Sequence, residues 1–154
     1  MAMLTKTIGD VINMTEVYLY ALSCSLGRGA QQNQDDRAKF LLTYLSEKEL
    51  DLYRLTKDIG EKADGNELKT WFYEYSDRHS VIHSDPHALS FSTMSPDEVQ
   101  SRIAEIHNEL IDLYQHMKER AENNNIKQVL ESVLKTFNSS VNQISASAET
   151  VREL

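Results

Sequence analysis

The strongest constraint on the fold is a helical repeat of apolar residues that recurs in four long stretches of the chain. In each stretch, apolar side chains follow one another at steps of three and four residues, which places them on one face of an α-helix. Only five glycines and two prolines occur among the 154 residues, which favours long helices over a sheet with many turns. We therefore predict an all-α protein with helices at about residues 4–26, 36–62, 96–122 and 125–151.

Local signals mark several helix ends. Gly27 and Gly29 predict the end of the first helix, because glycine accepts the left-handed conformation that often follows a helix. Asp35 or Asp36 is a suitable N-cap for the second helix. The run Ser95-Pro96-Asp97-Glu98 combines an N-cap serine, a proline in the first turn and a capping-box glutamate, so it predicts the start of the third helix.

The lengths of the connections predict how the helices are ordered. The first and last connections are short, which indicates two antiparallel hairpins, and Asn123-Asn124-Asn125 is the turn of the second one. The middle connection, residues 63–94, is long enough to cross a bundle of helices about 35–40 Å in length. Within it we expect a short amphipathic helix around Glu67–Ser76 and a break at Pro86. Residues 1–154 thus form one domain, a four-helix bundle with a long crossover between helices two and three.

Charge and cysteine content narrow the possible partners and compartment. The net charge of −8 argues against nucleic acid and against anionic membranes, since both attract clustered lysine and arginine. A single cysteine, Cys24, forms no intrachain disulfide, and residues 1–7 contain no apolar signal-peptide core. We expect a cytoplasmic protein with neither a nucleic-acid nor a membrane partner.

Two helical ladders carry a resemblance to a known family. The runs Tyr114–Ala121 and Ile126–Val133, joined by the asparagine turn, resemble the second helical hairpin of rubrerythrin-type ferritin-like proteins. The run Phe40–Glu49 is similar to the matching ladder of their first hairpin. The resemblance implies a ferritin-like bundle in up-down-down-up order. It also implies a di-iron site with one Glu on the first helix of each hairpin and Glu-x-x-His on the second.

The resemblance also assigns the ligand positions of the second and fourth helices. It places Glu49 at a carboxylate position of the second helix, but Leu52 stands where the histidine is expected. On the fourth helix it places Phe137 at the carboxylate position and Ser140 at the histidine position. Leu52 and Phe137 would fill the metal cavity with hydrocarbon.

On the first and third helices the resemblance points to other residues. His107 occupies the position at which the third helix would supply a glutamate. The corresponding residue of the first helix is Asn13, and Glu16 is a possible substitute one turn further on. Glu49, His107 and Glu16 are therefore the candidate metal ligands. With half of the ligand set missing, we expect no cofactor, and iron or another divalent metal is the alternative.

Glu49 and His107 can also be explained without a metal ion. Glu49 interrupts an apolar face, and a small rotation of the helix would leave its carboxylate at the bundle edge or beside a lysine. If it points inward, it must pair, bind a proton or bind a cation, because an isolated buried charge costs several kcal/mol. His107 flanks the apolar face of the third helix, where it can be a hydrogen-bonded core residue instead of a ligand.

A second metal pattern lies in the crossover. His79 and His83 are one helical turn apart, and together with His107 and Asp112 they resemble the second half of a hemerythrin site. The first half is absent, because the first two predicted helices contain no histidine. His79 and His83 are thus alternative metal ligands, and the other interpretation is an exposed connector with incidental histidines.

The sequence contains no pattern typical of an enzyme. It has no recognisable Ser-His-Asp or Cys-His grouping and no glycine-rich phosphate loop, which argues against an enzyme but leaves an enzyme or regulator of another kind as a third alternative. The predicted function is that of a ferritin-like bundle without its di-iron site, which serves as an interaction or small-ligand protein. We expect a homodimer or another protein partner on an aromatic or apolar helix face. The alternative is a divergent metal-binding protein, either rubrerythrin-like or hemerythrin-like.

Overall fold

The protein is all-α, as predicted. The computed structural model describes residues 6–63, 65–69, 71–72, 86 and 89–153. Four long helices make up most of this part: α1 (Ile8–Gln32), α2 (Asp36–Lys62), α4 (Pro96–Arg120) and α5 (Asn124–Glu153). The shorter elements are β1 (Lys6–Thr7), α3 (Gly65–Leu68), β2 (Trp71–Phe72) and the 3-10 turn η3 (Phe91–Thr93).

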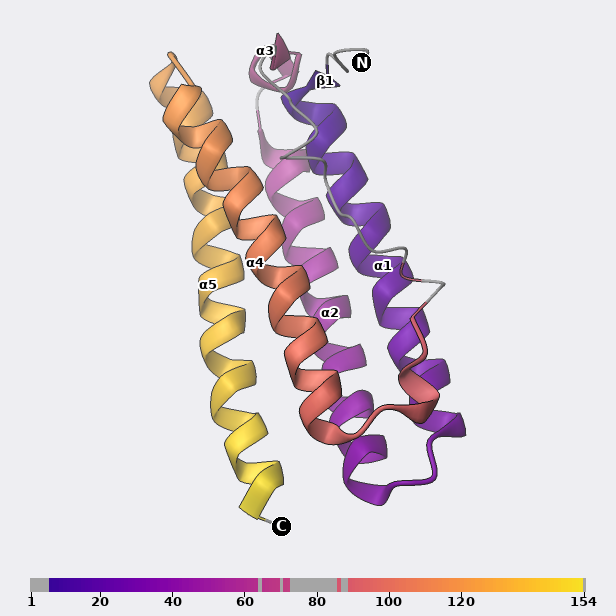
Figure 1. The fold of residues 1–154 in the computed structure, drawn as a ribbon. Coiled ribbons are helices and arrows are strands. Elements are labelled where there is room, and N and C mark those ends of the chain that lie inside the picture. Colours follow the sequence, from indigo (N-terminus) through magenta and orange to yellow (C-terminus); the bar gives the residue numbers. More distant parts are fainter. Residues whose placement is uncertain (1–5, 64, 70, 73–85, 87–88, 154) are drawn as a thin grey trace, which may run out of the picture.

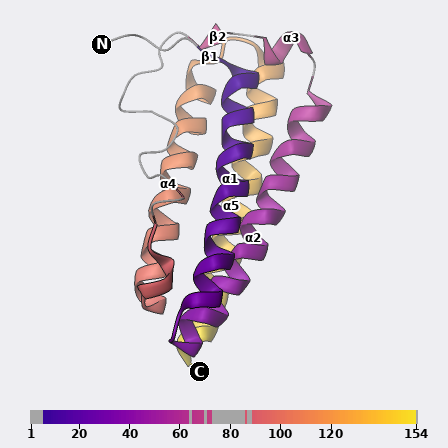
Figure 2. The same cartoon turned by 90° about the vertical axis from the view of Figure 1, so that its right-hand side faces the viewer.

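The four long helices form two antiparallel hairpins that lie side by side. In Figure 1, α1 descends and α2 returns, whereas α4 ascends and α5 descends to the C-terminus. The two middle helices, α2 and α4, therefore run in the same direction. In the view of Figure 2, α5 lies behind α1 and α2. Hydrogen bonds join α5 to α2, from Ser147 Oγ to Tyr44 Oη at 2.8 Å and from Lys48 Nζ to Gln143 Oε1 at 3.0 Å.

The N-terminal caps explain where the first two of these helices begin. Thr7 and Asp10 form a capping box that starts α1 at Ile8, so the predicted start near residue 4 is wrong. Asp35 caps α2 by accepting hydrogen bonds from the amides of Arg37 and Ala38.

The predicted start of α4 at Ser95-Pro96 is confirmed. The Ser95 hydroxyl accepts from the Glu98 amide, and the Glu98 carboxylate accepts from the Ser95 amide. Pro96 occupies the first turn, where its missing amide hydrogen costs no helical hydrogen bond.

The predicted end of α1 at Gly27 and Gly29 is wrong, because the helix continues through both to Gln32. No described glycine has a positive φ, so neither residue serves as a left-handed cap. Gly29 is needed for packing instead, since a Cβ atom there would lie 2.5 Å from the Cβ of Phe91. Next to it, the Asn33 side-chain amide donates to the carbonyls of Phe91 and Met94 at 2.9 and 3.0 Å. These contacts hold η3 against the end of α1.

Two further boundaries differ from the predictions. The helix α4 ends at Arg120, and α5 begins at Asn124 behind a turn in which the Asn123 side chain accepts from the Asn125 amide at 2.7 Å. The helix expected at Glu67–Ser76 is wrong where the structure describes it. There α3 ends at Leu68, and residues 71–72 pair with residues 6–7 as an antiparallel strand.

The core lies between the four helices and is closed at one side by Phe91, which is 1% exposed. Its apolar side chains come from every long helix, as in a bundle whose helices each bury one stripe. Leu55 follows the buried Leu52 by three residues, yet it is 51% exposed, and the neighbouring Thr56 is buried instead. A shift of one residue rotates a side chain by about 100° around a helix, which moves Leu55 to the outside. No helix in the described part of the chain has an apolar stretch of the length that crosses a bilayer.

The two glycines of α1 provide a matched test of this packing. We expect Gly29→Ala to destabilise the protein by about 1–3 kcal/mol, because the new Cβ atom would overlap Phe91. Gly27→Ala is the control. Its Cβ atom would meet only the Ser46 hydroxyl, at 3.4 Å, so the higher helix propensity of alanine should stabilise the protein by about 0.5–1 kcal/mol. Urea denaturation measures both, and equal stabilities would show that η3 does not pack against Gly29.

Candidate functional site

The most unusual group inside the bundle is a buried acid–imidazole pair. Glu49 of α2 is 0% exposed and His107 of α4 is 4% exposed. Their side chains meet across the core, with Glu49 Oε1 and His107 Nε2 2.5 Å apart. A hydrogen bond from a protonated imidazole to a carboxylate is charge-assisted, which makes it stronger than a bond between neutral groups. The interpretation of Glu49 as a residue at the bundle edge is therefore wrong.

Helical periodicity explains why both side chains point inward. Glu49 follows Leu45 by four residues and precedes Leu52 by three, and both leucines are buried. On α4, His107 lies four residues after Ile103 and three before Leu110, which are buried as well. Side chains at these spacings share one helix face. Because α2 and α4 run in parallel, the two polar positions reach the same height in the bundle.

Two opposing effects act on the imidazole of His107. Burial lowers its pKa, since a charged ring loses its hydration in the core. The adjacent Glu49 carboxylate raises the pKa through its charge and through the hydrogen bond, and the net direction is upward. In the folded protein the proton is therefore held more tightly than by a histidine in water, and Nε2–H donates to Glu49 Oε1.

One carboxylate oxygen of Glu49 has no hydrogen-bond partner among the described residues. Glu49 Oε2 is buried and makes no hydrogen bond with any residue that the structure describes, and the same holds for Thr56 Oγ1. Thr56 lies two turns after Glu49 on the same helix face, about 10 Å away along the axis. Buried oxygens without a partner are uncommon, and each can accept a hydrogen bond from water or contact a cation.

Glu16 does not join the pair. Its carboxylate lies at the seam of α1 and α2, where Oε2 is 3.8 Å from the position of a Cβ atom on Gly60. Gly60 follows Glu49 by eleven residues, about 16 Å along α2. Partial burial raises the pKa of Glu16, Lys57 lowers it, and Glu61 raises it. Of the three predicted ligands, the fold thus brings together Glu49 and His107 only.

The other ligand positions hold hydrocarbon or lie at the rim. Leu52 and Phe137 are each 2% exposed, and the Phe137 ring packs edge-on against Tyr114 with ring centroids 5.6 Å apart. Ser140 is 8% exposed. Among the described residues there is no group of three or more His, Cys, Asp or Glu side chains arranged to hold a metal ion. A di-iron centre of this type uses four glutamates and two histidines, so the described residues do not fit one.

The alternative ligands of the crossover, His79 and His83, lie outside the described residues. Sequence reasoning did not find a second buried polar contact, in which Tyr114 Oη lies 2.7 Å from Thr15 Oγ1. The Thr15 hydroxyl donates to the Val11 carbonyl at 2.9 Å, which leaves the Tyr114 hydroxyl as the donor to Thr15. Burial raises the pKa of Tyr114, so the phenol keeps its proton. The only available signal was that both residues lie within helical stripes.

Comparisons of the chain with protein-family models, with curated proteins and with solved structures give no match.

A double-mutant cycle tests the buried pair. His107→Leu leaves the Glu49 carboxylate buried without its partner, and we expect it to destabilise the protein by about 3–5 kcal/mol. The double variant Glu49→Leu/His107→Leu removes both polar groups and should be as stable as the wild type or more stable. Urea denaturation gives the free energies of unfolding. If the stability losses of His107→Leu and of the other single variant, Glu49→Leu, simply added in the double variant, the two residues would not interact.

The raised pKa of His107 predicts a pH dependence of stability. An unfolded histidine has a pKa of about 6.5, so above this pH the folded state retains a proton that the unfolded state has released. The contribution to stability is therefore complete below about pH 6.5 and is lost as the pH rises through the folded-state pKa. We expect the stability of the wild type relative to Glu49→Leu/His107→Leu to fall above this pH, by at most about 1.4 kcal/mol per pH unit. Denaturation of both proteins over a pH series measures it, and a difference that stays constant or increases above pH 6.5 contradicts the pairing.

Proposed function

We propose that this chain is a ferritin-like bundle that has lost its di-iron chemistry and serves as an interaction protein. The order of the helices, two hairpins joined by a long crossover, supports the ferritin-like arrangement. The loss of the metal centre is supported by Leu52 and Phe137, which are buried at two of the ligand positions that the resemblance implies. Hydrocarbon at these positions packs the interior without any metal.

The observation that carries the interaction proposal is the exposure of large apolar side chains on the first hairpin. Val17 and Tyr20 are three residues apart on one side of α1 and are 63% and 51% exposed, whereas the exposed Leu55 of α2 lies on the side that faces α5. Exposed apolar residues that gather on one face are typical of protein interaction sites, and aromatic residues are enriched in such sites. The surface of the first hairpin is therefore the part of the molecule that we expect to act.

A second candidate function is the binding of one divalent metal ion at Glu49 and His107. The specific observation in its favour is Glu49 Oε2, a buried carboxylate oxygen without a hydrogen-bond partner among the described residues. A carboxylate beside an imidazole offers two ligands that suit iron or zinc. Two ligands are fewer than the three or four protein ligands that such ions have in stable sites, so this function ranks second.

Metal analysis distinguishes the two functions. The protein is purified without an affinity tag and incubated anaerobically with ferrous iron, and Glu49→Leu/His107→Leu is treated in the same way. We expect less than one metal ion per chain, in equal amounts for both proteins, because the interior lacks a complete ligand set. If the wild type bound two iron atoms per chain and the variant bound none, the proposed function would be overturned. One ion per chain that the variant loses would favour the second candidate.

A further inference from the structure

The outer side of the first hairpin carries a continuous apolar strip. On α1, Val17, Tyr20 and Cys24 follow one another at steps of three and four residues, so they share one side of the helix, and all three are exposed. Tyr20 packs edge-on against Tyr53 of α2, with ring centroids 5.3 Å apart. Leu50 precedes Tyr53 by three residues and is partly exposed. We name these five residues and the charged residues at the two ends of the strip the α1/α2 outer face. Figure 2 looks onto α1 and α2.

One end of the α1/α2 outer face is acidic. Near the start of α1 and the end of α2 it carries the carboxylates of Asp10, Glu16 and Glu61, with Lys57 as the opposing charge. Lys57 lies over the Tyr53 ring, 5.9 Å from its centroid. Burial raises the pKa of Glu16, and although Lys57 lowers it, Glu61 raises it again. Within one chain, this end therefore has more negative than positive charge.

The opposite end of the α1/α2 outer face carries exposed cations. Near the end of α1 and the start of α2 these are Arg28 and Lys39, with Asp36 and Glu47 as the opposing charges. Neither Arg28 nor Lys39 makes an ion pair with any residue that the structure describes. The strip of apolar residues thus lies between an acidic end and an end whose charges balance.

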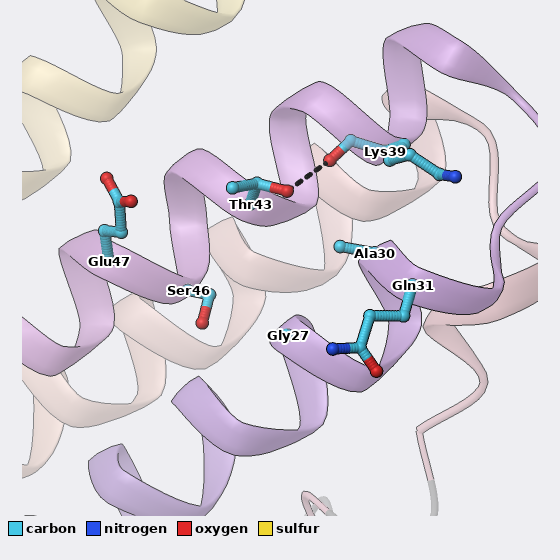
Figure 3. Close-up of a pocket in the computed structure, with 7 residues that line it drawn as sticks. All are labelled: Gly27, Ala30, Gln31, Lys39, Thr43, Ser46 and Glu47. Carbon is cyan, nitrogen blue, oxygen red and sulfur yellow. Dashed lines mark hydrogen bonds between the residues drawn. The ribbon is translucent and has the colours of Figure 1, made fainter.

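A shallow groove lies at the end of the face that carries Arg28 and Lys39. It has a volume of about 580 Å³ and runs between α1 and α2, as Figure 3 shows. The helices approach closely here because Ser23 and Ser46 each donate to the carbonyl of the other, at 2.7 and 2.8 Å. The floor consists of small residues, and longer side chains form the rim; the lining residues are Gly27, Ala30, Gln31, Lys39, Thr43, Ser46 and Glu47. A surface of this shape accepts projecting side chains of a second protein.

From this arrangement we propose that the α1/α2 outer face binds the same face of a second copy of the chain, with the helices antiparallel across a two-fold axis. A two-fold axis that lies in the plane of the interface, perpendicular to the helices, places the acidic end of one copy over Arg28 and Lys39 of the other. A parallel arrangement would place the two acidic ends together, which repels. The two apolar strips then meet at the centre, where interface residues contribute most to affinity. The inference rests on the proposed function and identifies the partner.

The size of the face agrees with such a dimer. With 25 residues, α1 is about 37 Å long at 1.5 Å per residue. Two adjacent helices of about 10 Å diameter therefore present roughly 700 Å². Each partner of a stable protein complex buries about 800 Å², so the whole length of the face is needed. A short peptide would cover only part of it.

Sedimentation analysis over a range of protein concentrations tests the dimer, with the full chain in each case. We expect the wild type to dimerise and Tyr20→Lys to weaken the dimer about 100-fold, because the variant places two lysines near the axis in place of aromatic anchors. Leu55→Lys is the matched control. Leu55 is as exposed as Tyr20, 51% in both cases, but lies on the side of α2 that faces α5, so its replacement should leave the dimer unchanged.

A charge exchange tests the orientation and does not depend on Tyr20. Arg28→Glu/Lys39→Glu should weaken the dimer at least tenfold, because both ends of the face are then acidic. Adding Glu16→Lys/Glu61→Lys makes the formerly acidic end net positive opposite a net negative one and should restore the affinity to within a few-fold of the wild type. Restoration is not expected if the four substitutions merely damage the fold.

The outcomes separate this inference from the proposed function. A monomer at every concentration, or a dimer that Leu55→Lys weakens and Tyr20→Lys does not, overturns the α1/α2 dimer without affecting the metal analysis. Failure of the four-residue exchange to restore a dimer weakened by Arg28→Glu/Lys39→Glu overturns the antiparallel orientation. Two iron atoms per chain together with an intact dimer would instead overturn the proposed function and leave the interface in place.

Discussion

The packing of the two hairpins depends on how the bundle accommodates a carboxylate at its centre. Glu49 is fully buried on α2, and its charge is compensated by His107 from the other hairpin. A buried pair of this kind contributes little net stability compared with apolar residues, because both groups lose their hydration. Losing either partner is costly, however. The pair thus favours one relative height of α2 and α4, the two parallel helices that belong to different hairpins.

Other hydrogen bonds between helices also fix the position of one helix relative to another. The Tyr114 hydroxyl bonds Thr15 and so joins α4 to α1, whereas the reciprocal bonds of Ser23 and Ser46 join α1 to α2. Apolar stripes attract any other apolar stripe, since the hydrophobic effect has no direction. Hydrogen bonds between defined residues depend on distance and angle, so they distinguish one helix register from another.

The interior and the surface of the bundle differ in what they offer to a binding partner. The interior brings together two potential metal ligands and fills other ligand positions with Leu52 and Phe137, which leaves no complete site among the described residues. The surface retains exposed apolar side chains, of which Val17 and Tyr20 lie between an acidic end and the end that carries Arg28 and Lys39. This distribution is the reason why the proposed function is protein binding and not metal chemistry.

The sequence alone determined the long helices and several of their ends, because these depend on interactions within a few residues. The caps at Asp35 and Ser95 are examples, and so is the inward stripe of α2 from Ala38 to Leu52. The tertiary structure decided where the partners of each helix lie. Gly29 lies inside the helix and leaves room for Phe91 to pack on it, Leu55 turns outward, and Glu49 meets His107 instead of lying at an edge. Such outcomes depend on contacts between residues far apart in the chain, and periodicity within one helix contains no information about which helix stands opposite.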